Sequence, residues 1–269
     1  MLAIKNNLMA ANAARYLGQS YDALGTSVER LSSGLRINSA ADDAAGMAVR
    51  ELMRADIAVL QQGARNAQDG VSMLQTMEGA LQVIDNLLIR MQQLAEQAST
   101  GSYTSTQRDI MNNEFTEMAN EIDRIATATN FNGIGMLDNS AVVKIHFGDS
   151  SDQICVAGSN MTASGLSINS LSITGQTNAI SALGSITSAI ETKDTARAKF
   201  GYTINRLEST GEVLGIQAEN LLAAESRISD VDVATEMATL TRNQVLAQAG
   251  TSMLAQANSI PQMALTLLR

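Results

Sequence analysis

The sequence predicts a mainly α fold: a long antiparallel helical bundle or coiled-coil rod, with both termini at one end and a small antiparallel β patch at the far tip. Three observations predict it. Apolar residues recur three and four residues apart over most of the chain. Its 269 residues include one proline, Pro261, so the residues before it can form very long helices without a proline break. Aromatic residues make up 3% and Trp is absent, so aliphatic residues must form the core, which favours helix-on-helix packing.

The two ends of the chain carry matching heptad patterns. The N-terminal pattern is apolar in its second half and small or polar in its first half, where Asn7 and Ala10 occupy the same frame. Because heptads pair helices, we predict that the terminal helices pair through these positions. The terminal seam, which we also expect to drive self-association, consists of Leu17, Tyr21, Leu24, Val28, Leu31, Leu35, Leu246, Ala249, Met253, Ile260, Met263 and Leu267.

Further helices are predicted between the two ends. Apolar residues alternate three and four apart over 74–98, 111–125 and 200–221, and a polar break separates the first two stretches at 100–107. From about 138 to 176 the spacing changes to two, with Gly and Asp-Ser clusters between short runs, which predicts the β patch. Within it, Cys155 is expected to be a small buried residue. The chain therefore runs out in helices, turns through the β patch and returns in helices.

The stretch LSSGLRINSAADDAAG, residues 31–46, is predicted to be a joint between helices. We expect Gly34 to end the first helix in the left-handed conformation, and Asn38 or Ser39 to cap the next one. Asp42 and Asp43 would then lie in its first turn, where negative charge is favourable, with Arg36 as their ion partner. An acid pair or a metal site is disfavoured because neighbouring helical side chains point about 100° apart.

Composition excludes several functional classes. A net charge of −9 argues against nucleic acid and anionic membrane surfaces as partners, and no window reaches the roughly 18 apolar residues of a membrane span. Cys155 is the only cysteine and His146 the only histidine, so neither a disulfide, a zinc-protease motif nor a Ser-His pair can form within the chain. We predict a protein that is not an enzyme and holds no cofactor or metal.

Several long motifs resemble bacterial flagellin. They are LSSGLRINSAADDAAGMAVR, ARNAQDGVSMLQTMEGAL, EIDRIATATNFNG, NRLE and SRISDVDVATEM followed by QVLAQAGTSMLAQANSIPQMALTLLR. The resemblance covers about 1–137 and 180–269. Many flagellins carry large outer domains in the middle, whereas this chain has only about 40 residues of β character there, so it resembles a minimal, core-only form.

The resemblance implies a secreted subunit that polymerises into the helical, tubular flagellar filament used for swimming. It implies an inner coiled-coil domain from 1–42 and 229–269, an outer helical domain from 43–228, and the joint as the connection between them. It also implies hook-associated junction and cap proteins as partners, an export chaperone on the C-terminal region, and flagellar type III export in place of a signal peptide.

A possible immune partner follows from the same resemblance. Toll-like receptors recognise some flagellins on the outer helical domain, and the matching positions here are Arg90, Leu94, Gln97 and Glu114. Ile89 departs from the family pattern, where Gln is typical, and so do Gln92 and Gln93.

Two other functions stay open. A hook–filament junction protein shares the flagellin termini, although the unbroken SAADDAAG and the long C-terminal match favour the filament subunit. Another extracellular helical secretion component, such as a needle-tip or translocator protein, is not expected to carry all of these motifs.

Overall fold

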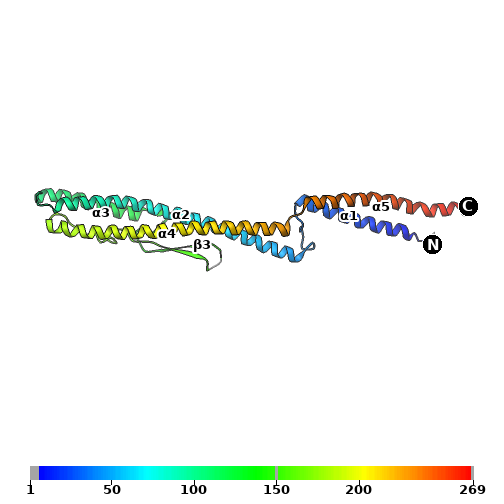
Figure 1. The fold of residues 1–269 in the computed structure, drawn as a ribbon, viewed down its shortest axis with the longest axis horizontal. Helices are drawn as coiled ribbons and strands as arrows, with labels where there is room; N and C mark the ends of the chain where they lie inside the picture. The colour runs from blue at the N-terminus through cyan, green and yellow to red at the C-terminus, as the bar shows by residue number, and fades with distance from the viewer. Residues whose placement is uncertain (1–5, 149–150, 268–269) are drawn as a thin grey trace. The chain divides into compact units, whose positions relative to one another are not determined.

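The computed structural model describes the backbone of residues 6–148 and 151–267, and the side chains of those up to Ile260. Figure 1 shows a mainly helical chain, which confirms the predicted fold class. The helices are α1 (Leu8–Ser33), α2 (Ala44–Ser99), α3 (Ser105–Ala128), α4 (Gln176–Ser229) and α5 (Val233–Leu267). Two antiparallel hairpins are formed by β1 (Asn130–Phe131) with β2 (Ile134–Gly135), and by β3 (Val142–His146) with β4 (Gln153–Ala157).

The chain divides into two compact units. Unit 1 comprises residues 1–57 and 219–269, and unit 2 comprises residues 58–218, so that α2 and α4 each cross the division. The predicted domain boundaries at residues 42 and 229 lie at the joint between helices and differ from the boundaries of these two units. The predicted domains stay a prediction.

The core of unit 2 lies among α2, α3, α4 and the β segments. The predicted apolar stripe of α2 is fully buried, which confirms its spacing: Leu74, Met77, Leu81, Ile84, Leu88, Met91, Ala95 and Ala98. Phe115 and Ile122 of α3 and Phe200 and Leu207 of α4 join it. Lys193 is also buried in this core, where its ammonium group pairs with Asp85 of α2. This ion pair fixes α4 against α2, because an unpaired buried ammonium is costly.

The predicted polar break between α2 and α3 is confirmed. The Thr104 hydroxyl accepts the Gln107 N–H, and the Gln107 side chain accepts the Thr104 N–H, so the two residues form a capping box that starts α3. After α3, the Asn132–Gly133 turn joins β1 to β2 with φ values of 51° and 79°. Asn-Gly is the dipeptide that favours such a two-residue turn.

The predicted β patch is confirmed only in its first half. β3 and β4 pair from Val142–Ala157 to His146–Gln153, but residues 158–175 form no strand. The apolar residues of that segment are buried as a strap over α3, where Asn112 and Asp123 side chains accept the Ile173 and Ala163 N–H groups. Ser167 has a φ of 56°, which interrupts any extended strand.

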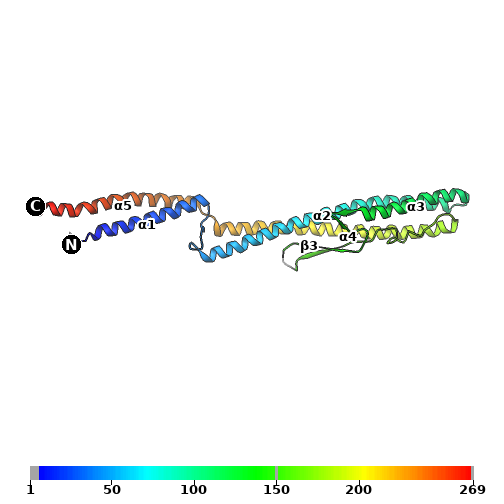
Figure 2. The ribbon, with the colours of Figure 1, turned by 180° about the vertical axis from the view of Figure 1, so that it is seen from behind.

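The position predicted for the β patch, at the far tip, is wrong. The β3 strand lies along α2 where unit 2 begins, whereas the turn to α3 closes the opposite end of the unit (Figures 1 and 2). Asn66 of α2 donates to the His146 carbonyl at 2.9 Å, and the strand approaches Gly63 and Gly70 closely. Small residues on α2 therefore decide where the hairpin packs.

Cys155 is exposed, contrary to the expected burial. The alternation of β4 explains this: its neighbours Ile154 and Val156 face the core, so the residue between them faces outward.

Gly63→Ala and Gly79→Ala provide a matched test of this packing. A Cβ at Gly63 would lie 2.1 Å from the Phe147 carbonyl oxygen, whereas nothing lies within 4 Å of one at Gly79. We expect Gly63→Ala to lower the free energy of unfolding of unit 2 by roughly 1–3 kcal/mol, because backbone has to shift. Gly79→Ala should raise it by up to about 1 kcal/mol through helix propensity. Chemical denaturation of both variants measures these changes; an unchanged stability in Gly63→Ala would contradict the close contact.

Candidate functional site

The terminal helices form an antiparallel pair within unit 1. The Asn7 side-chain amide donates to the Ala257 carbonyl at 2.8 Å near the two chain ends, and Arg30 lies 3.9 Å from Glu236 at the other end of the pair. The start of α1 and the end of α5 therefore lie at the same end of the α1–α5 pair (Figure 1). This confirms the pairing that the two heptad patterns predict.

Small residues and leucines form the interface between α1 and α5. Ser27, Ala247 and Ala257 are its most buried members, with exposed fractions of 2%, 6% and 7%. Leu17 packs against Gly250, where a Cβ would lie only 3.0 Å from the Leu17 Cδ1 atom. The inward positions keep heptad spacing and combine five half-buried leucines with serine, alanine, asparagine and glycine, so the pair leaves part of its apolar area exposed. They are Leu17, Ser20, Leu24, Ser27, Leu31, Leu240, Asn243, Ala247, Gly250, Leu254 and Ala257.

About half of the predicted terminal seam is therefore wrong as an α1–α5 interface. Leu17, Leu24 and Leu31 face α5, but Tyr21 and Val28 are 53% and 49% exposed. In α5 the frame is displaced by one residue, which leaves three seam residues exposed: Leu246, Ala249 and Met253. The physical reason is helix separation, because Ser20, Ser27 and Gly250 allow a close approach that Tyr21 or Met253 would prevent.

The remaining seam residues lie at its ends. Leu35 and Ile260 are half-buried. Met263 and Leu267 lie outside the residues whose side chains the structure describes. We name the exposed large residues Tyr21, Val28, Leu246 and Met253 the outer stripe; they are 49% to 63% exposed. Tyr21 and Val28 are seven residues apart on α1, and Leu246 and Met253 are seven apart on α5, so each helix carries one exposed row.

Backbone pairing holds the joint together. Gly34 has a φ of 74° and donates its N–H to the Arg30 carbonyl, so it ends α1 as predicted. Two chain segments then pair: the Arg36 N–H donates to Ser229 at 2.6 Å, and the Val231 N–H donates to Gly34 at 3.1 Å. The exit from α1 is thereby tied to the turn between α4 and α5.

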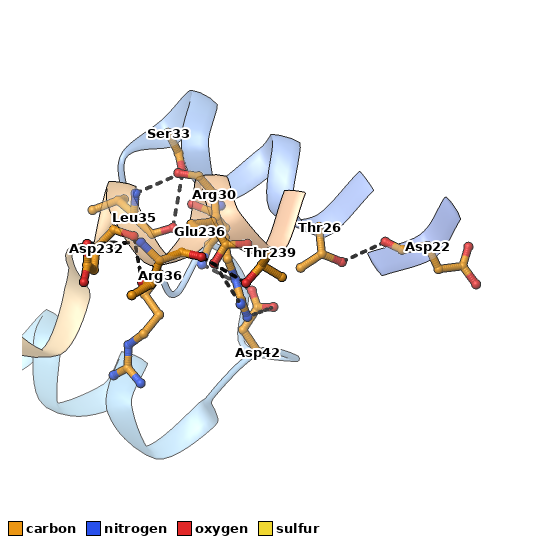
Figure 3. Close-up of polar contacts among 12 residues, drawn as sticks. Asp22, Thr26, Arg30, Ser33, Leu35, Arg36, Asp42, Asp232, Glu236 and Thr239 are labelled. Carbon is orange, nitrogen blue, oxygen red and sulfur yellow. Dashed lines mark hydrogen bonds and ion pairs between the residues drawn. The ribbon is translucent and has the colours of Figure 1, made fainter. Parts of the chain in front are cut away.

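Arg36 binds a carbonyl and not the predicted carboxylates. Its Nε and Nη2 atoms donate to the Ile228 carbonyl at 3.2 and 2.7 Å. The ion partner of Asp42 is instead Arg30, at 3.8 Å, which also lies 3.9 Å from Glu236 of α5. Arg30 thus links α1 to both the joint and α5, because its side chain lies between the carboxylates of Asp42 and Glu236 (Figure 3).

Asp42 and Asp43 precede α2, contrary to the prediction that they lie in its first turn. The Asp43 carboxylate accepts the Gly46 N–H at 2.9 Å and caps the helix, so neither Asn38 nor Ser39 is the cap. Asp42 organises the preceding turn, where its carboxylate accepts the backbone N–H groups of Asn38 and Ser39 at 3.2 and 2.9 Å. It also accepts the Ser39 hydroxyl at 3.0 Å.

The Asp42 carboxyl is held in its ionised form. The Ser39 N–H and hydroxyl, followed by the Asn38 N–H and the Arg30 guanidinium, keep its pKa below the ordinary value, against a smaller opposing effect of burial. The carboxylate acts as an anchor for the turn and not as half of a catalytic acid pair.

The four residues predicted as an immune-receptor face differ in exposure. Arg90 and Glu114 form an ion pair at 2.8 Å on the surface, and the exposed Gln97 donates to the Tyr103 hydroxyl at 2.8 Å. Leu94 is only 2% exposed and lies in the core of unit 2. The structure therefore presents three of the four side chains at the surface.

Across residues 6–148 and 151–260, no group of His, Cys, Asp and Glu side chains has the geometry of a metal site. Among the helices of that same part of the chain, none is long and apolar enough to cross a membrane.

The ionisation of Asp42 predicts an acid-sensitive joint. Because the folded-state pKa is lowered, the carboxylate stabilises the joint above its unfolded pKa of about 3.9, and this contribution disappears as the pH falls through the folded pKa. The Asn38 and Ser39 amide resonances should follow this titration with a midpoint below about 3.9. The pH-dependent shift should vanish in Asp42→Asn. A midpoint at or above the ordinary value would contradict the hydrogen-bonded geometry.

Comparisons with known proteins agree on one family. Residues 4–142 match the bacterial flagellin N-terminal helical region, and residues 183–268 match the bacterial flagellin C-terminal helical region. A flagellin of Halalkalibacterium halodurans is 42% identical over 270 residues, covering 99% of both chains. A flagellar filament 33 kDa core protein of Treponema phagedenis is 40% identical over 284 residues, again covering 99% of each.

Solved structures show the same kinship. The crystal structure of Bacillus cereus flagellin covers 60% of this chain and 94% of its own, with 33% identity and a TM-score of 0.51. A putative flagellar hook-associated protein from Vibrio parahaemolyticus has a TM-score of 0.59 over 70% of this chain and 100% of its own, but its 15% identity shows a shared fold alone. The chain belongs to the bacterial flagellin family.

Proposed function

We propose that this flagellin assembles into the filament through the outer stripe, while the inward small residues of α1 and α5 keep the two helices of each subunit paired. The observation that carries the proposal is the division of large and small residues. Tyr21, Val28, Leu246 and Met253 are exposed, whereas Ser27, Ala247 and Ala257 face the partner helix. A helix pair that turns its large apolar residues outward gains more from burying them against other subunits.

Burial of the outer stripe supplies part of the driving force for polymerisation. Complete burial of a fully exposed apolar side chain contributes about 1.5–3 kcal/mol. The four side chains are about half exposed, so burying the rest of them contributes roughly 3–6 kcal/mol per subunit toward the cost of ordering and association. The contact is heterologous, because the stripe of one subunit meets a different surface of the next. Repeated contacts of this kind form an open helix when their rotation does not close.

The same division supports ordering of the terminal helices on assembly. Within one subunit the inward leucines stay half-buried because the residues between them are small, and isolated helices with little packing are marginal in water. Neighbouring subunits would supply the missing burial. The inner domain of residues 1–42 and 229–269 would then be the part that becomes ordered in the filament.

Further partners and location follow from family membership. We propose that the protein acts outside the cell as a structural subunit without enzymatic activity. It would leave the cell by flagellar type III export. Hook-associated junction and cap proteins would contact the two ends of the polymer, and an export chaperone would hold the C-terminal region before secretion. A Toll-like receptor would contact Arg90, Gln97 and Glu114, which are exposed, but not Leu94, which is buried.

Charged substitutions separate the two roles of the terminal helices. Met253→Asp places a charge on the outer stripe, and Leu24→Asp places one inside the α1–α5 pair. We expect both to abolish filaments, because each leaves an unpaired charge in a buried contact. Met253→Leu, which conserves volume, should still polymerise. Sedimentation and electron microscopy of purified protein measure assembly, and circular dichroism with limited proteolysis checks that unit 2 stays folded.

The result for Met253→Asp decides the proposal. Normal filaments from this variant, together with none from Leu24→Asp, would show that helix pairing matters and that the outer stripe does not contact other subunits.

A further inference from the structure

We propose that Met253 is a reversible oxidation site that controls assembly of the subunit. A peroxide converts its thioether to a sulfoxide, and the oxidised subunit adds to a filament far less readily. The proposal rests on the proposed function, because it assumes that the outer stripe is buried on polymerisation. It adds a chemical modification, and a means of control, that the assembly contact alone does not contain.

Exposed methionines are confined to the terminal helices among the side chains that the structure describes. They are Met9 of α1 and Met237 and Met253 of α5, with exposed fractions of 67%, 47% and 63%. An oxidant in solution therefore reaches these thioethers before those of the core, so that unit 2 stays folded when α1 and α5 are oxidised. The other described methionines are buried or half-buried: Met47, Met53, Met73, Met77, Met91, Met111, Met118, Met136 and Met161.

Met253 differs from the other exposed methionine of α5 in its place on the helix. It follows Leu246 by seven residues and belongs to the outer stripe. Met237 lies sixteen residues before Met253, so at about 100° per residue it points roughly 160° away around the helix. Oxidation of Met253 therefore changes the surface that is buried on assembly, whereas oxidation of Met237 changes another face.

The side chains next to Met253 are poor partners for a sulfoxide oxygen. The sequence has no charged residue between Arg242 and Arg269. The hydroxyl groups of Thr251 and Ser252 already donate to the Gln248 carbonyl, at 2.8 and 3.1 Å. A sulfoxide is polar and accepts hydrogen bonds, so burying it against this uncharged surface leaves its oxygen unpaired, which is costly.

The chemistry needs only a peroxide and is reversible. A lone pair of the thioether sulfur attacks one oxygen of hydrogen peroxide, the S–O bond forms, the O–O bond breaks, and the second oxygen leaves as water. Sulfur is oxidised by two electrons and the peroxide is reduced by two. Methionine sulfoxide reductases return the thioether with electrons from a dithiol, which becomes a disulfide while the sulfoxide oxygen leaves as water.

Peroxide treatment of dissociated subunits tests the switch. The protein used carries Cys155→Ser, because the exposed cysteine also reacts with peroxide. Mass spectrometry should find sulfoxide at Met253, and the critical concentration for assembly should rise roughly tenfold, equivalent to about 1.4 kcal/mol. Methionine sulfoxide reductases for both sulfoxide epimers, with dithiothreitol, should restore it. Circular dichroism with limited proteolysis checks that unit 2 stays folded.

Two leucine variants of the Cys155→Ser protein assign the effect to one residue. Met253→Leu conserves volume and has no sulfur, so its critical concentration should be the same before and after peroxide. Met237→Leu is the matched control on the same helix and should stay as sensitive as the Cys155→Ser protein. Equal loss of assembly in Met253→Leu and in the Cys155→Ser protein would overturn the proposal.

Failure of this proposal and failure of the proposed function give different results. If Met253→Asp forms no filaments but subunits fully oxidised at Met253 assemble at an unchanged critical concentration, this proposal alone is overturned. If Met253→Asp assembles normally, the outer stripe is not an assembly contact, and the proposed function is overturned together with this proposal.

Discussion

The close contact between Leu17 and Gly250 is the constraint on which the terminal helices depend. It brings α1 and α5 near enough for serine, alanine and leucine to face each other, which leaves no room for Tyr21 or Met253 between them. These larger side chains point outward, where other subunits can bury them. We propose that assembly competence follows from how tightly one subunit packs its own two helices.

The joint makes this arrangement possible within unit 1. The chain leaves α1 at Gly34 and enters α5 after Asp230, and backbone hydrogen bonds hold these two points side by side. Arg30 contacts carboxylates from both segments, so the end of α1 cannot move without losing them. The two adjacent aspartates have separate structural roles and are not a catalytic pair. Asp42 accepts hydrogen bonds within the turn, and Asp43 caps α2.

Helix periodicity predicted the part of the unit 2 core that α2 contributes, because burial there depends on a strong three-four repeat of large residues. The interface of the terminal helices was harder to predict. In α5 the exposed row of Leu246 and Met253 lies one position from the inward row that contains Ala247, and pattern reasoning favours the row with the larger residues. Asn243, Ala247, Gly250 and Ala257 did carry a signal, a heptad of small residues. Contacts between residues distant in sequence, such as Arg36 with Ile228, leave no pattern in the local sequence and could not be predicted. The strap at 158–175 was predicted as strand because its apolar and polar residues alternate, although it forms none.

The most direct test of the account is a high-resolution cryo-electron microscopy map of filaments grown from the full-length protein. We expect Leu17 to contact Gly250 within each subunit, while Tyr21, Val28, Leu246 and Met253 contact neighbouring subunits. A map in which these four side chains face their own partner helix, or line a solvent-filled channel without touching another subunit, would contradict the claim that outward-facing residues of the terminal pair drive assembly.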